Sequence, residues 1–259
     1  MASPQPAQQP AAAKAGILPS HAIQALVAAG AIRLAKPLVD GQVQPASLDL
    51  RLGPRAIRVR ASFLPGRRMR VADRLEELAL HEIDLSAGAV LETGCVYIVP
   101  LLEALALEAG IAAAANPKSS TGRLDVFTRV IADHAQEFDK IDPGYQGPLY
   151  AEISPRTFPV LVREGSRLAQ IRFRSGHAVC SDAELSALHE SEGLVLEAEA
   201  NIDGGLALSV DLRGEASGLV GFRAKRHTAL VDVDKVGAYQ VLDFWEPIFS
   251  HGQSSLILD

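Results

Sequence analysis

A run of polar residues at 116–123 has the composition of an anion-binding turn. Its sequence, Asn-Pro-Lys-Ser-Ser-Thr-Gly-Arg, places Lys118, Ser119 and Ser120 just ahead of Arg123. Hydroxyls and backbone N–H groups donate to phosphate oxygens, and a guanidinium adds bidentate, charge-assisted bonds. The run therefore suits a phosphate chain. Taken alone, however, Ser-Ser before a helical turn with an exposed Arg is more often ordinary helix capping.

A carboxylate in a strand is the second candidate for chemistry. Glu152 lies in the expected strand 149–153, on the face opposite Leu149, Ala151 and Ile153. Most such glutamates face solvent. In a closed pocket, the same carboxylate could activate a water molecule and return its proton, which is general acid/base catalysis tuned by burial.

Other polar residues carry weaker signals. Asp142 precedes Pro-Gly, a natural start for a turn, and His134 and Glu137 are expected on the surface. The chain contains no G-x-S-x-G elbow, no Gly-rich phosphate loop ending in Lys-Ser/Thr and no G-x-G-x-x-G. It also lacks the H-x-E and P-C-x-x-C signatures of zinc-dependent base deaminases, which excludes that class of site.

The elements that must hold these residues are mainly strands. Apolar and polar residues alternate with a period of two, which predicts half-buried strands, in segments 48–52, 57–60, 149–153 and 169–173. Pro and Gly punctuate the intervals between them. We therefore expect a mainly β fold, a sandwich or distorted barrel with a few short helices.

Short helices and a low-complexity tail complete the organisation. Ser20 is the expected N-cap of a helix that Gly30 ends, a second helix is expected near 73–80, and Ser181 with Glu184 forms a capping box for a third. The predicted parts are a disordered tail at 1–16, a β domain at 17–175, a helical linker at 176–204 and a partial second half at 205–259.

An internal echo suggests two related halves. The strand sequence Ser-Leu-Asp-Leu-Arg at 47–51 returns as Ser-Val-Asp-Leu-Arg at 209–213. A five-residue echo is weak evidence, since two unrelated strands can share such a pattern. Two related halves and two ordinary strands are therefore alternative explanations of the echo.

Composition bounds the class of protein. Of the 259 residues, 48% are hydrophobic and 22% charged, which is typical of a globular protein, and the formal charge of −6 argues against binding duplex nucleic acid. No apolar run could span a membrane, and residues 1–16 lack the core of a secretion signal. Cys95 and Cys180 are expected as buried thiols in a reducing, cytoplasmic setting.

Four motifs in a fixed order now resemble one superfamily. They are Lys-Ser-Ser-x-x-Arg at 118–123, Ile-Asp-Pro-Gly-Tyr-x-Gly at 141–147, Glu152, and Gly-x-Arg-Leu-Ala-Gln at 165–170. Together with the early strand at 47–51 they resemble the dCTP deaminase and dUTPase superfamily over about residues 17–175. The arginine that ends the first motif and the position of Glu152 resemble dCTP deaminase more than dUTPase. The whole chain looks like the longer, two-half bacterial type.

The resemblance implies a dUTPase-like, trimeric enzyme whose sites form between subunits. It would convert dCTP and water to dUTP and ammonia without a metal, although Mg²⁺ accompanying the triphosphate is left open. Glu152 would shuttle protons between the attacking water, N3 and the departing amine. The remaining implied substrate-binding residues are Lys118, Ser119, Ser120, Arg123, Arg129, Val130, Ala132, Asp142, Tyr150, Ala151 and Gln170.

The implied contacts differ along the chain. Lys118, Ser119, Ser120 and Arg123 would hold the triphosphate or a neighbouring water, and Asp142 would face the sugar. The main chain near residues 150–151 would border the nucleotide, and that of 129–132 would face the cytosine edge, where fixed dipoles replace solvent.

Departures from the family pattern keep alternatives open. Extra residues stand at 133–140, and after Phe173 no equivalents are recognisable of the Tyr, Lys and Gln that the family lays over the triphosphate. The second half stops before an equivalent of Ser119. One alternative is a dUTPase or bifunctional enzyme that uses Mg²⁺. Another is a catalytically silent nucleotide-binding subunit.

Overall fold

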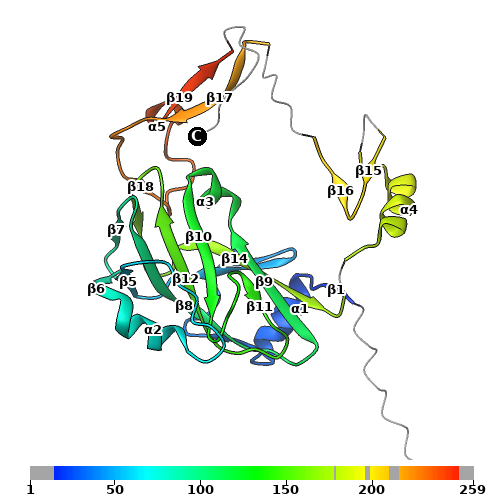
Figure 1. Ribbon diagram of the computed structural model, residues 1–259, viewed down its shortest axis with the longest axis horizontal. Helices are drawn as coiled ribbons and strands as arrows, with labels where there is room; N and C mark the ends of the chain where they lie inside the picture. Colours follow the sequence, from blue (N-terminus) through cyan, green and yellow to red (C-terminus); the bar gives the residue numbers. More distant parts are fainter. Residues whose placement is uncertain (1–14, 178, 196–198, 210–215, 251–259) are drawn as a thin grey trace, which may run out of the picture.

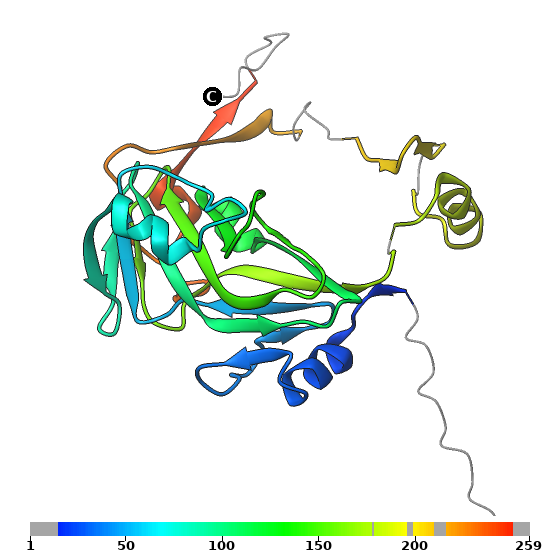
Figure 2. The ribbon, with the colours of Figure 1, turned by 60° about the horizontal axis from the view of Figure 1, so that its bottom comes forward.

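The computed structural model describes residues 15–177, 179–195, 199–209 and 216–250. The fold is mainly β, as predicted, and is built around two sheets that pack face to face (Figures 1 and 2). Among the described residues these sheets form a sandwich and do not close into a barrel. The predicted mainly β class is therefore confirmed, in its sandwich form.

The first sheet leads directly into the predicted phosphate-binding run 118–123, which follows one of its strands. Its order is β11-β9-β14-β4-β3, with β1 added to β14, and all its pairs are antiparallel. The strands are β1 (Gly16–Ile17), β3 (Val43–Gln44), β4 (Ser47–Arg51), β9 (Ile111–Pro117), β11 (Lys140–Ile141) and β14 (Arg167–Ser175). Gly16, which the sequence assigned to the tail, pairs with Ser175.

The second sheet carries Glu152. Its order is β10-β12-β8-β5-β6, with β2 paired to β8, and it is also antiparallel. The strands are β2 (Ile32–Leu34), β5 (Arg55–Val59), β6 (Ala79–Asp84), β8 (Val96–Ala106), β10 (Val126–Ala132) and β12 (Gln146–Pro155). A smaller sheet joins β7 (Ala89–Leu91), β13 (Val160–Val162) and β18 (Val231–Asp232).

The main core lies between the two large sheets. Leu48, Ile171 and Phe173 of the first sheet pack with Leu105 and Leu149 of the second, and all five are fully or almost fully buried. Burying apolar area of this kind is the main favourable contribution to folding. It fixes the register, because a slip of one residue would turn each strand's apolar face outward.

Helix α1 (Ser20–Ala28) covers one end of this core through the buried Ile23. The prediction of Ser20 as N-cap is wrong, because the Pro19 carbonyl already accepts from Ala22 N–H at 2.9 Å and the helix begins one residue earlier. The predicted stop is confirmed. Gly30 adopts φ +75°, and its N–H donates to the Val27 carbonyl at 3.0 Å, a left-handed helix end that glycine adopts without strain.

The other helices are also short. They are α2 (Val71–Leu78), α3 (Ser119–Arg123), α4 (Asp182–Glu192) and α5 (Val241–Phe244). The predicted capping box is confirmed: Ser181 Oγ accepts from Glu184 N–H at 3.3 Å, and the Glu184 carboxylate accepts from Ser181 N–H at 2.7 Å. No helix in the described part of the chain is long and apolar enough to cross a bilayer.

Strand β4 departs from the half-buried pattern that its alternation predicted. All five of its residues are buried, including Asp49 and Arg51. Arg51 pairs with the fully buried Glu103 of β8, with Nε 2.8 Å from Oε1. The polar face of β4 thus carries buried ion pairs, which alternation alone cannot distinguish from exposed charges.

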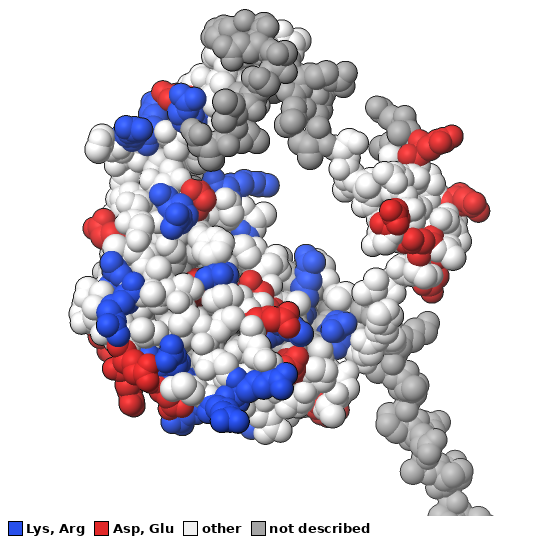
Figure 3. Space-filling model, viewed as in Figure 1, with Lys and Arg blue, Asp and Glu red and all other residues white. Residues whose placement is uncertain are grey.

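The segment after β14 leaves the two-sheet body. Helix α4 and the small hairpin of β15 (Asn201–Ile202) and β16 (Leu206–Ala207) lie apart from the sheets (Figures 1 and 2). Acidic side chains gather on α4 (Figure 3). This hairpin crosses the boundary at 204/205 that the sequence suggested between linker and second half.

A strand–helix–strand unit is repeated in the second half. In β5–α2–β6 the two strands pair antiparallel, and Arg60 N–H donates to the carbonyl of Leu78, the last helical residue, at 3.1 Å. In β17 (Leu219–Ala224), α5 and β19 (Trp245–Phe249), Lys225 N–H donates to Phe244 in the same way at 2.9 Å. The echoed strand at 209–213 lies, apart from Ser209, outside the described residues.

The cysteines do not fit their prediction as buried thiols. Cys95 is half-buried and Cys180 is exposed, and both are free. The cytoplasmic location that they suggested stays a prediction.

Candidate functional site

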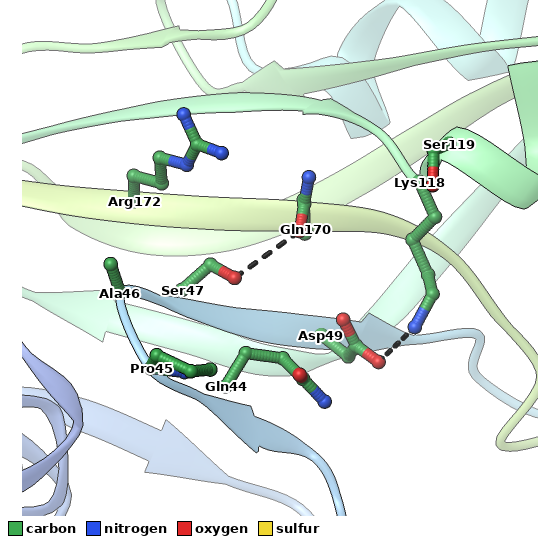
Figure 4. A pocket seen from close by; sticks show the side chains of 9 residues that line it. All are labelled: Gln44, Pro45, Ala46, Ser47, Asp49, Lys118, Ser119, Gln170 and Arg172. Carbon is green, nitrogen blue, oxygen red and sulfur yellow. Dashed lines mark hydrogen bonds and ion pairs between the residues drawn. The ribbon is translucent and has the colours of Figure 1, made fainter. Parts of the chain in front are cut away.

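A cavity of about 420 Å³ opens on the first sheet (Figure 4). It lies where β4, the turn before it, β14 and the start of α3 meet. The residues that line it are Gln44, Pro45, Ala46, Ser47, Asp49, Lys118, Ser119, Gln170 and Arg172. Asp49 and Gln170 are register partners on β4 and β14, and therefore lie side by side.

The polar groups of this cavity are partly paired with one another. Lys118 Nζ donates to Asp49 Oδ2, and Ser47 Oγ donates to Gln170 Oε1 at 3.2 Å. Asp49 is 1% exposed, and its Oδ1 has no hydrogen-bond partner among the described residues. Arg167 Nη1 lies 3.6 Å from Asp49 Oδ2, the oxygen that Lys118 contacts. Cations, hydroxyls and an amide around one buried carboxylate suit a polyanionic ligand.

The cavity brings together Lys118, Ser119 and Gln170 of the predicted substrate-binding residues. Sequence reasoning did not name Ser47, Asp49 and Arg172 as lining residues. The strand motif at 47–51 carries only a family likeness, and nothing in its alternation indicates that Asp49 faces a cavity.

Ser120, Arg123 and Asp142 are exposed and lie outside the lining of this cavity. Arg123 is the last residue of α3, and its side chain makes no hydrogen bond or ion pair with another described residue. Asp142 starts the predicted turn, in which its carbonyl accepts from Tyr145 N–H at 3.2 Å. His134 and Glu137 are exposed, as predicted.

Glu152 occupies a separate position on the second sheet. It is 1% exposed and faces Arg129 across the β10–β12 pair. Both Arg129 Nε, at 3.1 Å, and Arg129 Nη2 donate to Glu152 Oε1. The other oxygen, Oε2, is buried and has no partner among the described residues. A buried carboxylate oxygen without a partner is costly unless a water or ligand satisfies it.

The main chain of β10 is less accessible than a base-reading role requires. Val130 N–H donates to Asp139 Oδ1 at 2.7 Å, and the Val130 carbonyl accepts from Asp139 N–H at 2.8 Å. The Ala132 carbonyl accepts from Ala135 N–H at 3.3 Å. Residues 133–139, which fall within the segment 133–140 expected to be extra, thus occupy groups expected to face cytosine.

Burial shifts the pKa of two groups near Glu152, the Asp139 carboxyl and the Tyr150 hydroxyl. Burial raises the pKa of the Asp139 carboxyl, and the hydrogen bond from Val130 N–H only partly opposes this shift. Tyr150 and Ala151 are buried, and their main chain lies in the ladder between β10 and β8. They could border a ligand only through their side-chain faces. Burial also raises the pKa of the Tyr150 hydroxyl.

The predicted site residues therefore fall into two groups within one chain. Lys118, Ser119 and Gln170 line the cavity on the first sheet, whereas Glu152 and Arg129 lie on the second and share no lining residue with it. Within the described ranges, no group of three or more His, Cys, Asp or Glu side chains is arranged to hold a metal ion.

Two family models and a solved structure that match this chain carry the same description. A family model described as the 2′-deoxycytidine 5′-triphosphate deaminase N-terminal domain matches residues 14–177, and the corresponding C-terminal domain model matches residues 181–259. The crystal structure of 2′-deoxycytidine 5′-triphosphate deaminase from Agrobacterium tumefaciens is 62% identical, with a TM-score of 0.89, over 95% of this chain and 74% of that one.

Curated relatives agree with these matches. A dCTP deaminase, dUMP-forming, from Parafrankia sp. (strain EAN1pec) is 33% identical over 60% of this chain and 74% of its own length. A dCTP deaminase from Halorubrum lacusprofundi is 30% identical over 52% of this chain and 64% of its own. The family model alone covers more than half of the chain. The chain belongs to the dCTP deaminase family.

Proposed function

We propose that this protein deaminates dCTP hydrolytically, with Glu152 as the general acid and base. The observation that carries the proposal is the state of the Glu152 carboxylate, which is buried on β12 with Oε1 paired to Arg129 and Oε2 unpartnered. A carboxylate held in this way has one oxygen to accept and return a proton. General acid/base catalysis of this kind contributes about 10²–10⁴-fold to a rate.

The proposed steps balance without a further reactant. Glu152 Oε2 takes a proton from water, the hydroxide forms a bond to cytosine C4, and the proton passes to N3. Glu152 then takes the proton of the new C4 hydroxyl and gives it to the exocyclic amine. The C4–N bond breaks, and dUTP and ammonia leave.

The cavity on the first sheet is the proposed triphosphate site. Lys118, Ser119 and Gln170 line it with Arg172, and they supply cationic, hydroxyl and amide donors for phosphate oxygens. The unpartnered Oδ1 of Asp49 fits a water bound to Mg²⁺, because Mg²⁺ usually retains several waters when it accompanies phosphates. No proposed deamination step uses this metal.

The remaining predicted contacts stay proposals. Ser120 and Arg123 would approach the triphosphate from α3, and Asp142 would approach the sugar. Val130 and Ala132 could offer main-chain groups to cytosine only if residues 133–139 moved, because those groups are bonded at present.

A direct assay tests the function. Purified protein is incubated with dCTP, with and without EDTA, while dUTP and dUMP are separated by chromatography and ammonia is measured. We expect equal amounts of uridine nucleotide and ammonia, and deamination that survives EDTA. A Glu152→Gln variant should lose at least about 100-fold in kcat. A folded wild-type protein that binds dCTP without releasing ammonia would support the silent nucleotide-binding alternative.

Bifunctional chemistry is the second candidate. The Parafrankia relative is named as dUMP-forming, and Asp49 has a free oxygen beside the proposed phosphate site. A bifunctional enzyme would yield dUMP and pyrophosphate from dCTP, and an EDTA-sensitive second step would indicate Mg²⁺. If dUTP accumulates and added dUTP is stable, this candidate is excluded.

Assembly is proposed as homo-oligomeric, with a trimer favoured. The predicted site residues form two groups with no shared lining, as expected if neighbouring subunits complete each other's sites. Light scattering coupled to size-exclusion chromatography should give about three times the 27.5 kDa chain mass. A fully active monomer would contradict this proposal.

A further inference from the structure

We propose that the side chain of Arg129 is a positioning residue for Glu152, clamped by Phe138 of the 133–139 segment. This inference rests on the proposed function and extends it from the general base to the residue that orients that base. It differs from the role implied by family resemblance, in which Arg129 contributes main chain near cytosine.

The register of the sheet makes the pair. Arg129 on β10 and Glu152 on β12 are direct cross-strand partners, so their side chains leave the same face at neighbouring positions. Arg129 donates twice to the same carboxylate oxygen, Oε1. The usual fork-to-fork arrangement would occupy both oxygens. The asymmetric arrangement instead leaves Oε2 as the only oxygen that can exchange a proton with a water.

Three contacts fix the guanidinium in this arrangement. Its carbon lies 3.5 Å from the ring centroid of Phe138 and 4.8 Å from that of Phe127, and Nη2 donates to Ser62 Oγ at 2.9 Å. Cation–π contacts of this kind hold an arginine by its face, so that its edge remains free for hydrogen bonds. Arg129 therefore has little rotational freedom, and its hydrogen bonds fix the carboxylate in turn.

Phe138 reaches Arg129 because Asp139 anchors the end of its loop. Asp139 adopts φ +63° and holds both main-chain polar groups of Val130. It also accepts, through its carbonyl, from Ala115 N–H of β9 at 2.8 Å. The segment that the sequence predicted to be extra relative to the family, 133–140, thus carries one face of the clamp.

The charge balance supports the same role. Glu152 is almost fully buried, while the Arg129 side chain is 24% exposed at the rim of the pair. Burial alone disfavours a carboxylate, and a cation in contact with it opposes that cost. Arg129 thus stabilises the anion that must accept the water proton, and also covers Oε1 from solvent.

The first test separates positioning from binding. We measure kcat and KM for dCTP in Arg129→Ala and Arg129→Lys, with and without methylguanidinium in the assay. We expect kcat to fall about 100-fold in Arg129→Ala, because a misoriented base is costly, while KM changes less than about threefold. Methylguanidinium should restore at least about tenfold of the lost kcat. Arg129→Lys should be intermediate, since an ammonium keeps the charge but not the fork.

Matched controls isolate the clamp. Arg58 on β5 also lies over a ring, 5.7 Å from the centroid of Tyr97, but does not contact Glu152. Arg58→Ala should keep its kcat and show no response to methylguanidinium. Phe138→Leu should lower kcat about tenfold at unchanged KM, because the loosened guanidinium orients Glu152 less well. A normal kcat in Arg129→Ala, or a loss confined to KM, would overturn the inference.

The second test does not need activity. In a double-mutant cycle on thermal stability, Arg129→Ala should lower the Tm strongly, because Glu152 is left buried without a cation. Adding Glu152→Gln should recover at least half of that loss. Additive effects with an active wild-type enzyme would overturn the Arg129 inference alone. Strong coupling in a wild-type protein that does not turn over dCTP would overturn the proposed function alone.

Discussion

Asp139 holds both main-chain polar groups of Val130, accepting from its N–H at Oδ1 (2.7 Å) and donating its own N–H to the Val130 carbonyl (2.8 Å). Strand β10 is the edge of the second sheet, so these groups would otherwise be free to pair with a ligand. The bonds close part of the edge that family resemblance assigned to cytosine. If residues 129–132 contact cytosine as proposed, the substrate has to approach over their side-chain faces or displace residues 133–139.

Asp139→Asn is expected to show how much stability the protein loses by burying this carboxylate in its charged form. Burial raises the pKa of the Asp139 carboxyl in the folded protein. The stabilising contribution of such a group is fully present below its unfolded pKa of about 4 and is lost as pH rises through the higher folded pKa. Asn keeps the acceptor for Val130 N–H and tolerates positive φ.

The variant should therefore have a Tm equal to or above that of the wild type at pH 7–8. The difference should shrink as pH falls towards about 4, where the wild-type carboxyl is protonated. Differential scanning calorimetry across this pH range provides the measurement. A variant less stable than the wild type at pH 7–8, with the difference vanishing towards pH 4, would show that the charge of Asp139, and not only its acceptor, stabilises the fold.

Glu103→Gln is expected to be among the most destabilising single substitutions. Glu103 is fully buried and accepts from Arg51 Nε at 2.8 Å, Arg51 N–H at 2.7 Å and Gln42 Nε2 at 2.8 Å. Removing its charge leaves the buried guanidinium uncompensated, which costs about 3–5 kcal/mol. Urea unfolding measures the loss.

A control distinguishes the charge from the packing. The double variant Arg51→Met with Glu103→Leu removes both charges and should recover a large part of the lost stability. A single Glu103→Gln variant within about 1 kcal/mol of the wild type would show that water or a rearranged neighbour compensates Arg51.

Arg163→Ala is expected to loosen the second half from the sandwich. Arg163 Nη1 and Nη2 donate to the two oxygens of Asp232 at 2.7 and 2.9 Å, and Asp232 lies on β18, which pairs with β13. The Arg163 guanidinium holds the pKa of Asp232 below its usual range. The stabilisation is therefore present above a pH of about 4 and is lost as pH falls through the lowered pKa.

Hydrogen exchange can locate this effect. The N–H groups of Val231 and Val233 donate to β13 and the residue before it, at 3.2 Å each, and should exchange at least about tenfold faster in Arg163→Ala at pH 7. Arg223→Ala removes an exposed pair with Glu246 and serves as the matched control. Equal protection of Val231 in both variants would show that aromatic packing around Phe158 and Phe244 suffices for docking.

The strands were predictable because their signal is local. Alternation placed 149–153 and 169–173 correctly, and Pro-Gly punctuation placed the turn after Asp142. What alternation cannot show is which polar face is covered by a second element. Asp49 and Glu152 occur in similar patterns, yet both are buried because distant strands and loops close over them.

The site was predicted in part for a similar reason. Ser119 and Gln170 carry motif signals, and the structure brings them into one cavity. The Arg129–Glu152 pair depends on the register between β10 and β12, and the Phe138 contact depends on a loop whose conformation no short motif specifies. Both are long-range facts that a local pattern does not contain.

Arg172→Gln is expected to weaken binding of the triphosphate without affecting the chemistry. Arg172 is exposed and lines the cavity beside Gln170, whereas Glu152 lies on the other sheet. Losing one charge-assisted bond to phosphate should raise KM for dCTP about 10-fold, with kcat within about twofold.

Arg174 lies two residues further along the same strand and outside the cavity lining, so Arg174→Gln is the matched control. Slow turnover of deoxycytidine, which has no phosphates, should be the same in both variants. An equal rise in KM for the two variants would assign the effect to general electrostatic attraction, and a fall in kcat in Arg172→Gln alone would place Arg172 near the reacting base instead of the phosphates.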